Sequence, residues 1–242
     1  MKKLLQLLAT NASADAAPAI RAEAGAVYVY DVIDRDWGAS AAALVQALGT
    51  MKGQPVALHI NSPGGDVFEA RAMVAAIRAH DAPVTTYIDG LAASAATYLA
   101  LAGDKVHITD GGLFMVHNSW TLAWGNKHEM HTTADLLDKI DGTIAADYAR
   151  KTGASTEQIA AWMDAETWFT AEEAKAAGFV DEISGAAPDT SKAASRWNLS
   201  AYANAPKPAT PPAAPDPAEL AAQAERQHRL NRSRLALLDA KN

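Results

Sequence analysis

Residues 55–89 place the strongest constraint on the fold, because they contain two strand-like segments separated by a helical one. Residues 55–60 alternate in polarity and residues 83–89 are rich in β-branched side chains, as strands are. Residues 67–80 have the spacing of an amphipathic helix. The residues predicted on its buried face are Ala70, Met73, Val74 and Ile77. A strand–helix–strand connection within one sheet nearly always joins parallel strands, so this stretch predicts a parallel sheet covered by helices.

Further strands and helices are predicted on both sides of this unit. The predicted strands are 26–33, 105–108, 113–117 and 179–183, and the predicted longer helices are 40–48, 95–102 and 127–151. Two short helices begin at capping boxes, with Ser155 and Thr170 as the N-cap residues. This alternation of strands and helices predicts an α/β domain over residues 26–186.

The segments outside this domain have different compositions. Residues 1–25 are predicted to form a flexible N-terminal arm, and Gln6 interrupts an apolar run that is too short for a secretory signal, so secretion is not expected. Residues 187–218 are predicted to be an Ala/Pro-rich linker, since residues 204–218 contain six of the chain's 11 prolines. Residues 219–242 are predicted to form a C-terminal helix.

Composition excludes several classes of function. The 242 residues include no cysteine, which excludes a disulfide scaffold, a thiol nucleophile and a thiolate metal site. The sequence has no run of about 18 or more apolar residues, so no membrane-spanning helix is expected. A net charge of −7 with scattered basic residues gives no nucleic-acid footprint. The spacing of histidines and carboxylates matches no metal site, and no cofactor is expected.

Two small-residue turns each lie between a predicted strand and a predicted helix. Residues 61–66 include Gly64 and Gly65, whose backbone can turn sharply and present N–H groups to a developing oxyanion, although an ordinary turn has the same composition. Residues 90–96 place Ser94 at a helix start. There it is either a nucleophile that a substrate carbonyl can approach or an ordinary N-cap.

A histidine stands at the end of the predicted strand at residues 113–117. His117 ends an apolar run, at the position where α/β folds tend to present catalytic groups, although a lone histidine is more often structural. An imidazole beside a serine hydroxyl can accept its proton and so activate it. His117 is thus a candidate for such a role, and the resemblance given next is what pairs it with Ser94.

Taken in order, three sequences resemble the signature of the Clp protease proteolytic subunit family: INSPGGDVFEA, GLAASAATYLALAGD and FMVHNS. The resemblance covers about residues 26–185 and implies the Clp/crotonase-like α/β superfold. It implies a serine endopeptidase in which Ser94 is the nucleophile and His117 the general base. It also implies that the backbone N–H groups of Gly65 and Ala95 form the oxyanion hole.

The third catalytic residue departs from the family pattern. The family has an aspartate where this sequence has Glu166, directly before residues 167–174. The resemblance therefore implies Glu166 as the acid that orients His117, with Asp164 as the alternative. A glutamate has this role in some α/β-hydrolases, but its longer side chain requires a different backbone distance.

Within this family, the sequence most resembles the Clp-related head maturation proteases of tailed bacteriophages and prophages. The resemblance is carried by residues 89–95, residues 163–169 and the Pro-rich tail. This subgroup implies cleavage of capsid and scaffold precursors in the bacterial host cytoplasm or inside the procapsid. The resemblance also implies a homo-oligomeric ring formed through residues 127–151, with peptide substrate added as a strand near residues 120–125. No docking pocket for an ATPase unfoldase is identified, so that partner is not expected, and neither is nucleic acid or a membrane.

Other functions are compatible with parts of the sequence. A signal-peptide-peptidase-like enzyme would use a Ser–Lys dyad, for which Lys105 is the nearest lysine after the nucleophile. A non-catalytic Clp-like scaffold would bind capsid subunits through the tail, and its support is Glu166 in place of aspartate. The acyl-CoA-binding crotonase branch of the superfold would have no use for Ser94 and His117 together.

Overall fold

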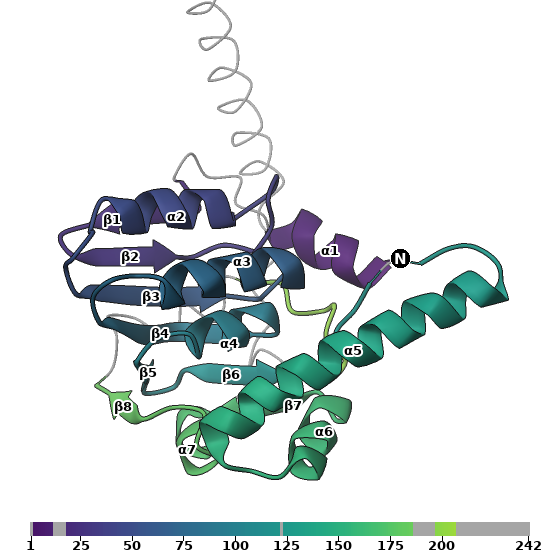
Figure 1. Ribbon diagram of the computed structural model, residues 1–242. Coiled ribbons are helices and arrows are strands. Elements are labelled where there is room, and N and C mark those ends of the chain that lie inside the picture. Colours follow the sequence, from purple (N-terminus) through teal and green to yellow (C-terminus); the bar gives the residue numbers. More distant parts are fainter. Residues whose placement is uncertain (1, 12–17, 122, 186–196, 207–242) are drawn as a thin grey trace, which may run out of the picture. The chain divides into compact units, whose positions relative to one another are not determined.

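The computed structural model describes residues 2–11, 18–121, 123–185 and 197–206 (Figure 1). The described residues all belong to one compact unit of the chain, which ends at residue 206. The predicted C-terminal helix lies outside the described residues, as does most of the predicted linker.

One eight-stranded sheet forms the framework of this unit, with the order β1-β2-β3-β4-β5-β8, while β6 pairs with β4 and β7. Its strands are β1 (Ile20–Glu23), β2 (Ala26–Val29), β3 (Val56–Ser62), β4 (Val84–Ala93), β5 (Lys105–Thr109), β6 (Leu113–Val116), β7 (Thr167–Thr170) and β8 (Glu182–Ser184). The pairings are parallel except those of β1 with β2 and of β6 with β7. The parallel pairing of β3 with β4 confirms the predicted strand–helix–strand unit.

In the described part of the chain, the helices are α1 (Lys2–Asn11), α2 (Ala41–Gly49), α3 (Val67–Arg78), α4 (Ala95–Ala100), α5 (Lys127–Thr152), α6 (Thr156–Asp164) and α7 (Ala171–Ala176). Figure 1 shows α2, α3 and α4 lying across one face of the sheet. The predicted apolar stripe of α3 is buried against it. None of these described helices combines the length and apolar character needed to cross a membrane.

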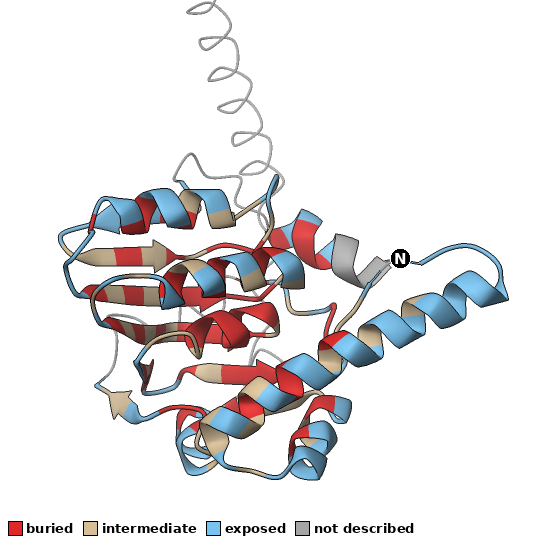
Figure 2. Cartoon of the chain, viewed as in Figure 1, coloured by how far each residue is buried: buried red, intermediate tan, exposed pale blue. Residues whose placement is uncertain are grey.

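Apolar side chains from the sheet and the helices form one large core cluster. Leu58 and Ile60 of β3, Ile88 of β4 and Met73 of α3 are all 0% exposed. Burying each such side chain stabilises the fold by about 1.5–3 kcal/mol. Figure 2 shows this buried layer between the strands and the covering helices. The core thus holds the ends of β3 and β4 in fixed positions.

Strand β4 has a different neighbour along each half of its length. Residues 85–88 pair with β5, whereas residues 91–93 pair with residues 113–115 of β6. Because this second pairing is parallel, β4 and β6 end at the same edge of the sheet. Ser94 directly follows β4 and His117 directly follows β6. The strand pairing alone therefore brings these two residues together.

The N-terminal segment contains ordered elements where the sequence predicts a flexible arm. Within residues 1–25, α1 buries Leu7 and Leu8, at 1% and 8% exposure. Strand β1 extends the sheet by pairing antiparallel with β2. The expectation of an arm is corrected for these elements, because the leucines find an apolar partner surface.

The predicted linker also contains an ordered part. Within residues 187–218, the structure describes residues 197–206, in which Trp197 and Tyr202 are 7% and 4% exposed. These aromatic side chains pack with Leu91 and Met115 in a second, smaller cluster. The linker expectation is therefore corrected for residues 197–206, because aromatic burial holds this part against the sheet.

Helix α5 is buried along only part of its length. Its buried residues, Ile140, Ile144, Ala145 and Tyr148, all lie in the second half of the helix. Figure 2 shows the first half exposed. That half begins at a capping box between Asn126 and Glu129, which satisfies N–H groups at the helix start without help from the core.

Candidate active site

Ser94 lies between β4 and α4 in a backbone conformation that residues with side chains seldom adopt. Its φ is 56° and its ψ is −126°. Such conformations cost about 1–3 kcal/mol and persist only where the surrounding structure holds them. Its N–H donates to the Met115 carbonyl of β6 at 2.9 Å. Ser94 occupies the N-cap position of α4, but its side chain makes no capping hydrogen bond to that helix.

The Ser94 hydroxyl instead faces His117. The His117 Nε2 lies 2.7 Å from the Ser94 Oγ, and the histidine is 8% exposed. The rings of Trp120 and Tyr202 meet the imidazole edge-on, with centroids 4.6 Å and 5.4 Å from its own. Such packing restricts the orientation of the imidazole. In this geometry Nε2 can accept the hydroxyl proton.

The glycine loop, residues 61–66, is attached to the backbone of Ile33. The Ile33 N–H donates to the Gly64 carbonyl at 2.9 Å, and the Asp66 N–H donates to the Ile33 carbonyl at 2.7 Å. Gly65 has a φ of +150°, and a Cβ there would lie 2.1 Å from the Ile33 carbonyl oxygen. Only glycine therefore fits at position 65 in this arrangement.

The glycine loop also lies directly against the turn that carries Ser94. A Cβ on Gly64 would lie 2.8 Å from the Ser94 Cβ and 3.1 Å from the Ala95 nitrogen. In the described part of the chain, the N–H groups of Gly65 and Ala95 have no hydrogen-bond acceptor. The two predicted oxyanion donors therefore belong to loops that adjoin at Ser94.

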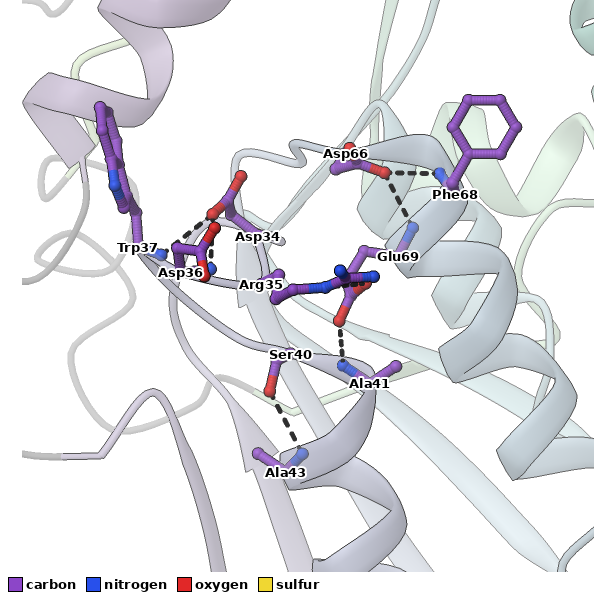
Figure 3. A network of polar contacts seen from close by, with 10 residues as sticks. All are labelled: Asp34, Arg35, Asp36, Trp37, Ser40, Ala41, Ala43, Asp66, Phe68 and Glu69. Atoms are coloured by element: carbon purple, nitrogen blue, oxygen red, sulfur yellow. Dashed lines mark hydrogen bonds and ion pairs between the residues drawn. The ribbon is translucent and has the colours of Figure 1, made fainter.

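The start of α3, directly after the glycine loop, is held by further contacts (Figure 3). The Asp66 carboxylate caps the helix by accepting the N–H groups of Phe68 and Glu69 at 2.7 Å and 2.8 Å. The Glu69 carboxylate reaches α2, where it accepts the Ala41 N–H at 2.7 Å, and pairs with Arg35 at 3.9 Å. These bonds fix the position of α3 relative to α2 and so support the loop.

The two candidate acids have different neighbours. Glu166 has a φ of 49°, and its carboxylate accepts the N–H groups of Ala203 and Asn204 at 3.0 Å and 2.6 Å. Asp164 accepts a hydrogen bond from Asn118 Nδ2 at 2.7 Å. Asn118 directly follows the histidine, so both acids lie on the side of the site formed by β6, α6 and residues 197–206.

An apolar cavity adjoins Ser94. Its wall includes Phe68, Tyr98, Leu137, Ile140, Ile144 and Tyr148. The sequence motifs do not identify this cavity, because its wall comes mainly from helices that only the fold brings to Ser94. The signal that points to it is the apolar stripe of α5.

Two phenols border this cavity. Burial raises the pKa of Tyr202 well above its usual value, and the Ser94 hydroxyl partly opposes that rise. Burial also raises the pKa of Tyr148, whose hydroxyl shares a 2.6 Å hydrogen bond with Thr97 Oγ1. Both phenols are therefore neutral near pH 7. Among the described residues, no cluster of histidine and carboxylate side chains could hold a metal ion.

The comparisons with known proteins agree on one family. The sequence model of Clp protease matches residues 16–187. The chain is 34% identical over 146 residues to the ATP-dependent Clp protease proteolytic subunit 3 of Streptomyces coelicolor. The aligned region covers 60% of this chain and 67% of that relative. It is 36% identical over 138 residues to the ATP-dependent Clp protease proteolytic subunit 1 of Chlamydia abortus, covering 55% of this chain and 72% of that relative.

Other relatives are covered to a similar extent. The ATP-dependent Clp protease proteolytic subunit of Bacteroides fragilis is 30% identical over 133 residues, with 54% of this chain and 64% of the relative covered. The chain thus spans about two thirds of the length of these curated relatives.

A solved structure supports the same fold. A ClpP1 mutant from Listeria monocytogenes superposes with a TM-score of 0.60 at 25% identity, over 69% of this chain and 94% of that chain. This likeness confirms the predicted Clp/crotonase-like α/β fold. Residues 61–66, 90–96 and 114–118 all lie within the matched region. The chain therefore belongs to the Clp protease family, a family of serine endopeptidases.

Proposed function

We propose that this chain hydrolyses peptide bonds with Ser94 as nucleophile, His117 as general base and Glu166 as the orienting acid. The observation that carries the proposal is the 2.7 Å separation of Ser94 Oγ and His117 Nε2, with the hydroxyl making no capping bond to α4. A serine hydroxyl is a weak nucleophile until an adjacent base takes its proton. Asp164 is the alternative acid, through its contact with Asn118.

The proposed reaction has two stages. Ser94 Oγ attacks the substrate carbonyl while its proton passes to His117 Nε2, and the N–H groups of Gly65 and Ala95 bind the resulting oxyanion. His117 then donates that proton to the leaving amine, which leaves an acyl-enzyme on Ser94. Water activated by His117 hydrolyses the acyl-enzyme and restores the hydroxyl.

The cavity beside Ser94 supports a preference for apolar substrates. Its wall is formed by aromatic and aliphatic side chains, including Tyr98, Ile140 and Ile144. Burial of an apolar side chain there gains free energy, whereas burial of a charged one is costly. We expect cleavage after apolar residues, with the peptide backbone paired near residues 120–125. Residue 122 of that segment lies outside the described residues.

The proposed biological role is head maturation in a tailed phage or prophage, by cleavage of capsid and scaffold precursors inside the host cell. The support for this role is a resemblance to the head maturation proteases of such phages. It is carried by residues 89–95, residues 163–169 and the Pro-rich tail. The proposed assembly is a homo-oligomeric ring formed through α5. The first half of α5 supports this assembly, because it leaves a long helical surface exposed in the described part of the chain.

Shell assembly with wild-type and Ser94→Ala chains tests this role. A protease is expected to cleave the precursors and to leave uncleaved, immature shells when Ser94 is replaced. Normal maturation with Ser94→Ala would contradict the proposal and would favour a non-catalytic assembly scaffold. Peptide hydrolysis by the same two chains checks the chemistry apart from the shell.

The Ser–Lys alternative is opposed by the register of the sheet. Lys105 pairs with Thr85 near the start of β4, whereas Ser94 follows the end of that strand. Nine residues of strand separate those positions by on the order of 30 Å. Lys105 therefore cannot act as the base for Ser94.

A further inference from the structure

Residues 197–206, which we call the cap, pack against the proposed active site. The region that matches the Clp protease family ends at residue 187, so the cap lies beyond it. Trp197, Ala201 and Tyr202 are each no more than 7% exposed and cluster with side chains of α1, β4 and β6. The described cap contains no helix or strand. Its position therefore depends on side-chain packing and individual hydrogen bonds.

The first half of the cap is tied to α1 and to the glycine loop. The Asn198 N–H donates to Asn11 Oδ1 at 2.6 Å, and Asn11 Nδ2 donates to the Asn198 carbonyl at 2.9 Å. The Trp197 Nε1–H donates to Asn61 Oδ1 at 3.0 Å. One end of the cap is thus fixed through Asn11 and Asn61, which take no part in the proposed chemistry.

Tyr202 brings the cap to the catalytic pair. Its hydroxyl donates to the Pro63 carbonyl at 2.6 Å, and its ring lies edge-on to His117. It also lines the cavity that Ser94 opens into. A peptide carbonyl that approaches Ser94 beside the glycine loop therefore comes close to Tyr202.

The second half of the cap holds the proposed orienting acid. Oε2 of Glu166 accepts the Ala203 N–H at 3.0 Å, and Oε1 accepts the Asn204 N–H at 2.6 Å. Asn204 Nδ2 also donates to the Ala165 carbonyl at 2.8 Å. Hydrogen bonds to a carboxylate are among the stronger ones in proteins. The cap therefore controls the direction of both carboxylate oxygens of Glu166.

We infer that the cap is an intramolecular inhibitor of the active site. In place, it puts Tyr202 in the wall of the cavity beside Ser94 and binds the carboxylate of Glu166. Its release opens the site to peptide and frees that carboxylate to orient His117. This inference rests on the proposed function. Release breaks no strand pairing, and it exposes the buried side chains of Trp197, Ala201 and Tyr202.

The rate of fluorophosphonate labelling at Ser94 tests the inference on the full chain. Tyr202→Ala is expected to label at least about tenfold faster than wild type, because it removes a buried ring and a hydrogen bond that hold the cap closed. Trp37→Ala is the matched control, since Trp37 is an aromatic residue that is 50% exposed and belongs to neither of the two core clusters. It is expected to label at the wild-type rate.

Asn11→Ala provides a second variant that leaves the catalytic cavity untouched. It removes both side-chain bonds to Asn198, so labelling is expected to rise by a smaller factor than with Tyr202→Ala. Amide hydrogen exchange at Asn204 is expected to rise in both variants, because that N–H loses its bond to Glu166 when the cap opens. A rise in labelling without a rise in exchange would overturn the inference.

The outcomes separate the cap from the proposed function. Equal rates of Ser94 labelling in wild type, Tyr202→Ala and Asn11→Ala would agree with the proposed serine protease activity. They would contradict the inference that the cap is an inhibitor. Slower labelling in Tyr202→Ala also overturns it, because Tyr202 would then support the nucleophile. Absence of any Ser94 adduct in folded chains of all variants contradicts the proposed function itself, and the cap as an inhibitor with it.

Discussion

At the residue scale, space and backbone conformation together require glycine in the glycine loop. We expect Gly65→Ala to lower kcat/KM by at least about 100-fold, because relief of the clash with the Ile33 carbonyl displaces a proposed oxyanion donor. Steady-state peptide hydrolysis measures this change, and thermal unfolding of the same variant should show a lower Tm.

Gly142→Ala is the matched control for that substitution. Gly142 lies inside α5, and a Cβ there would meet nothing within 4 Å. We expect it to keep full activity and to stabilise the helix by about 0.5–1 kcal/mol. Equal activity of the two variants would show that Gly65 has no part in catalysis.

The acid gives a second prediction at this scale. Glu166→Gln should reduce turnover by up to about 10⁴-fold, because a neutral amide cannot stabilise the imidazolium that forms on His117. Asp164→Asn should change turnover little, since the Asp164 carboxylate accepts from Asn118. Turnover measured in both variants decides between the two acids. Wild-type turnover in Glu166→Gln would remove it from the mechanism.

Residue roles that depend on local motifs could be predicted from the sequence, whereas contacts between residues far apart in the chain could not. The approach of Ser94 to His117 could be predicted from the resemblance of residues 90–96 and 114–118 to the Clp protease signature. The bonds from Glu166 to Ala203 and Asn204 could not, because 37 and 38 residues separate these partners. Likewise, Trp197 reaches Asn61 across 136 residues. No local pattern specifies such contacts.

At the scale of elements, long and strongly patterned segments could be predicted, whereas short ones could not. Helices α3 and α5 lie within two residues of their predicted bounds, because caps and apolar stripes mark them. The sequence pattern does not predict strand β7. Its four residues pair with β6, about 50 positions earlier in the chain. Strand β4 also extends to Ala93, past the predicted end at residue 89, because β6 supplies pairing there.

The contact between the end of α5 and the sheet gives a prediction about pH. The Asp181 carboxylate accepts Lys151 Nζ at 2.7 Å and 2.8 Å and the Val106 N–H at 2.8 Å. Partial burial raises the pKa of Asp181, but these hydrogen bonds outweigh it and hold the pKa below its usual value. A lowered pKa stabilises the fold at pH above the unfolded-state pKa, and this is lost as pH falls through the folded-state pKa.

We therefore expect Asp181→Asn to lower the free energy of unfolding by about 1 kcal/mol at neutral pH, after allowing for solvent screening of this partly exposed pair. Urea unfolding across a pH series should show wild type and variant converging under acid conditions. The exposed Asp110→Asn serves as the control, with no expected change. A deficit in Asp181→Asn that is constant at all pH values would contradict an ionic origin.

At the scale of the whole molecule, α5 is the surface expected to join copies of the chain. Met130, in its exposed half, is 36% exposed. Met130→Asp should raise the concentration needed for half-assembly by at least about tenfold, because a charge would be buried at an apolar contact. Sedimentation velocity over a concentration series measures this shift. Unchanged assembly would place the interface elsewhere.

The most direct test of an activated serine is intact-protein mass spectrometry after fluorophosphonate treatment. Peptide analysis then identifies the residue that carries the adduct. The proposed chemistry predicts one adduct per chain, located on Ser94, enhanced in Tyr202→Ala and absent from Ser94→Ala. An adduct that persists in Ser94→Ala, or its absence from every folded chain, would contradict Ser94 as the nucleophile.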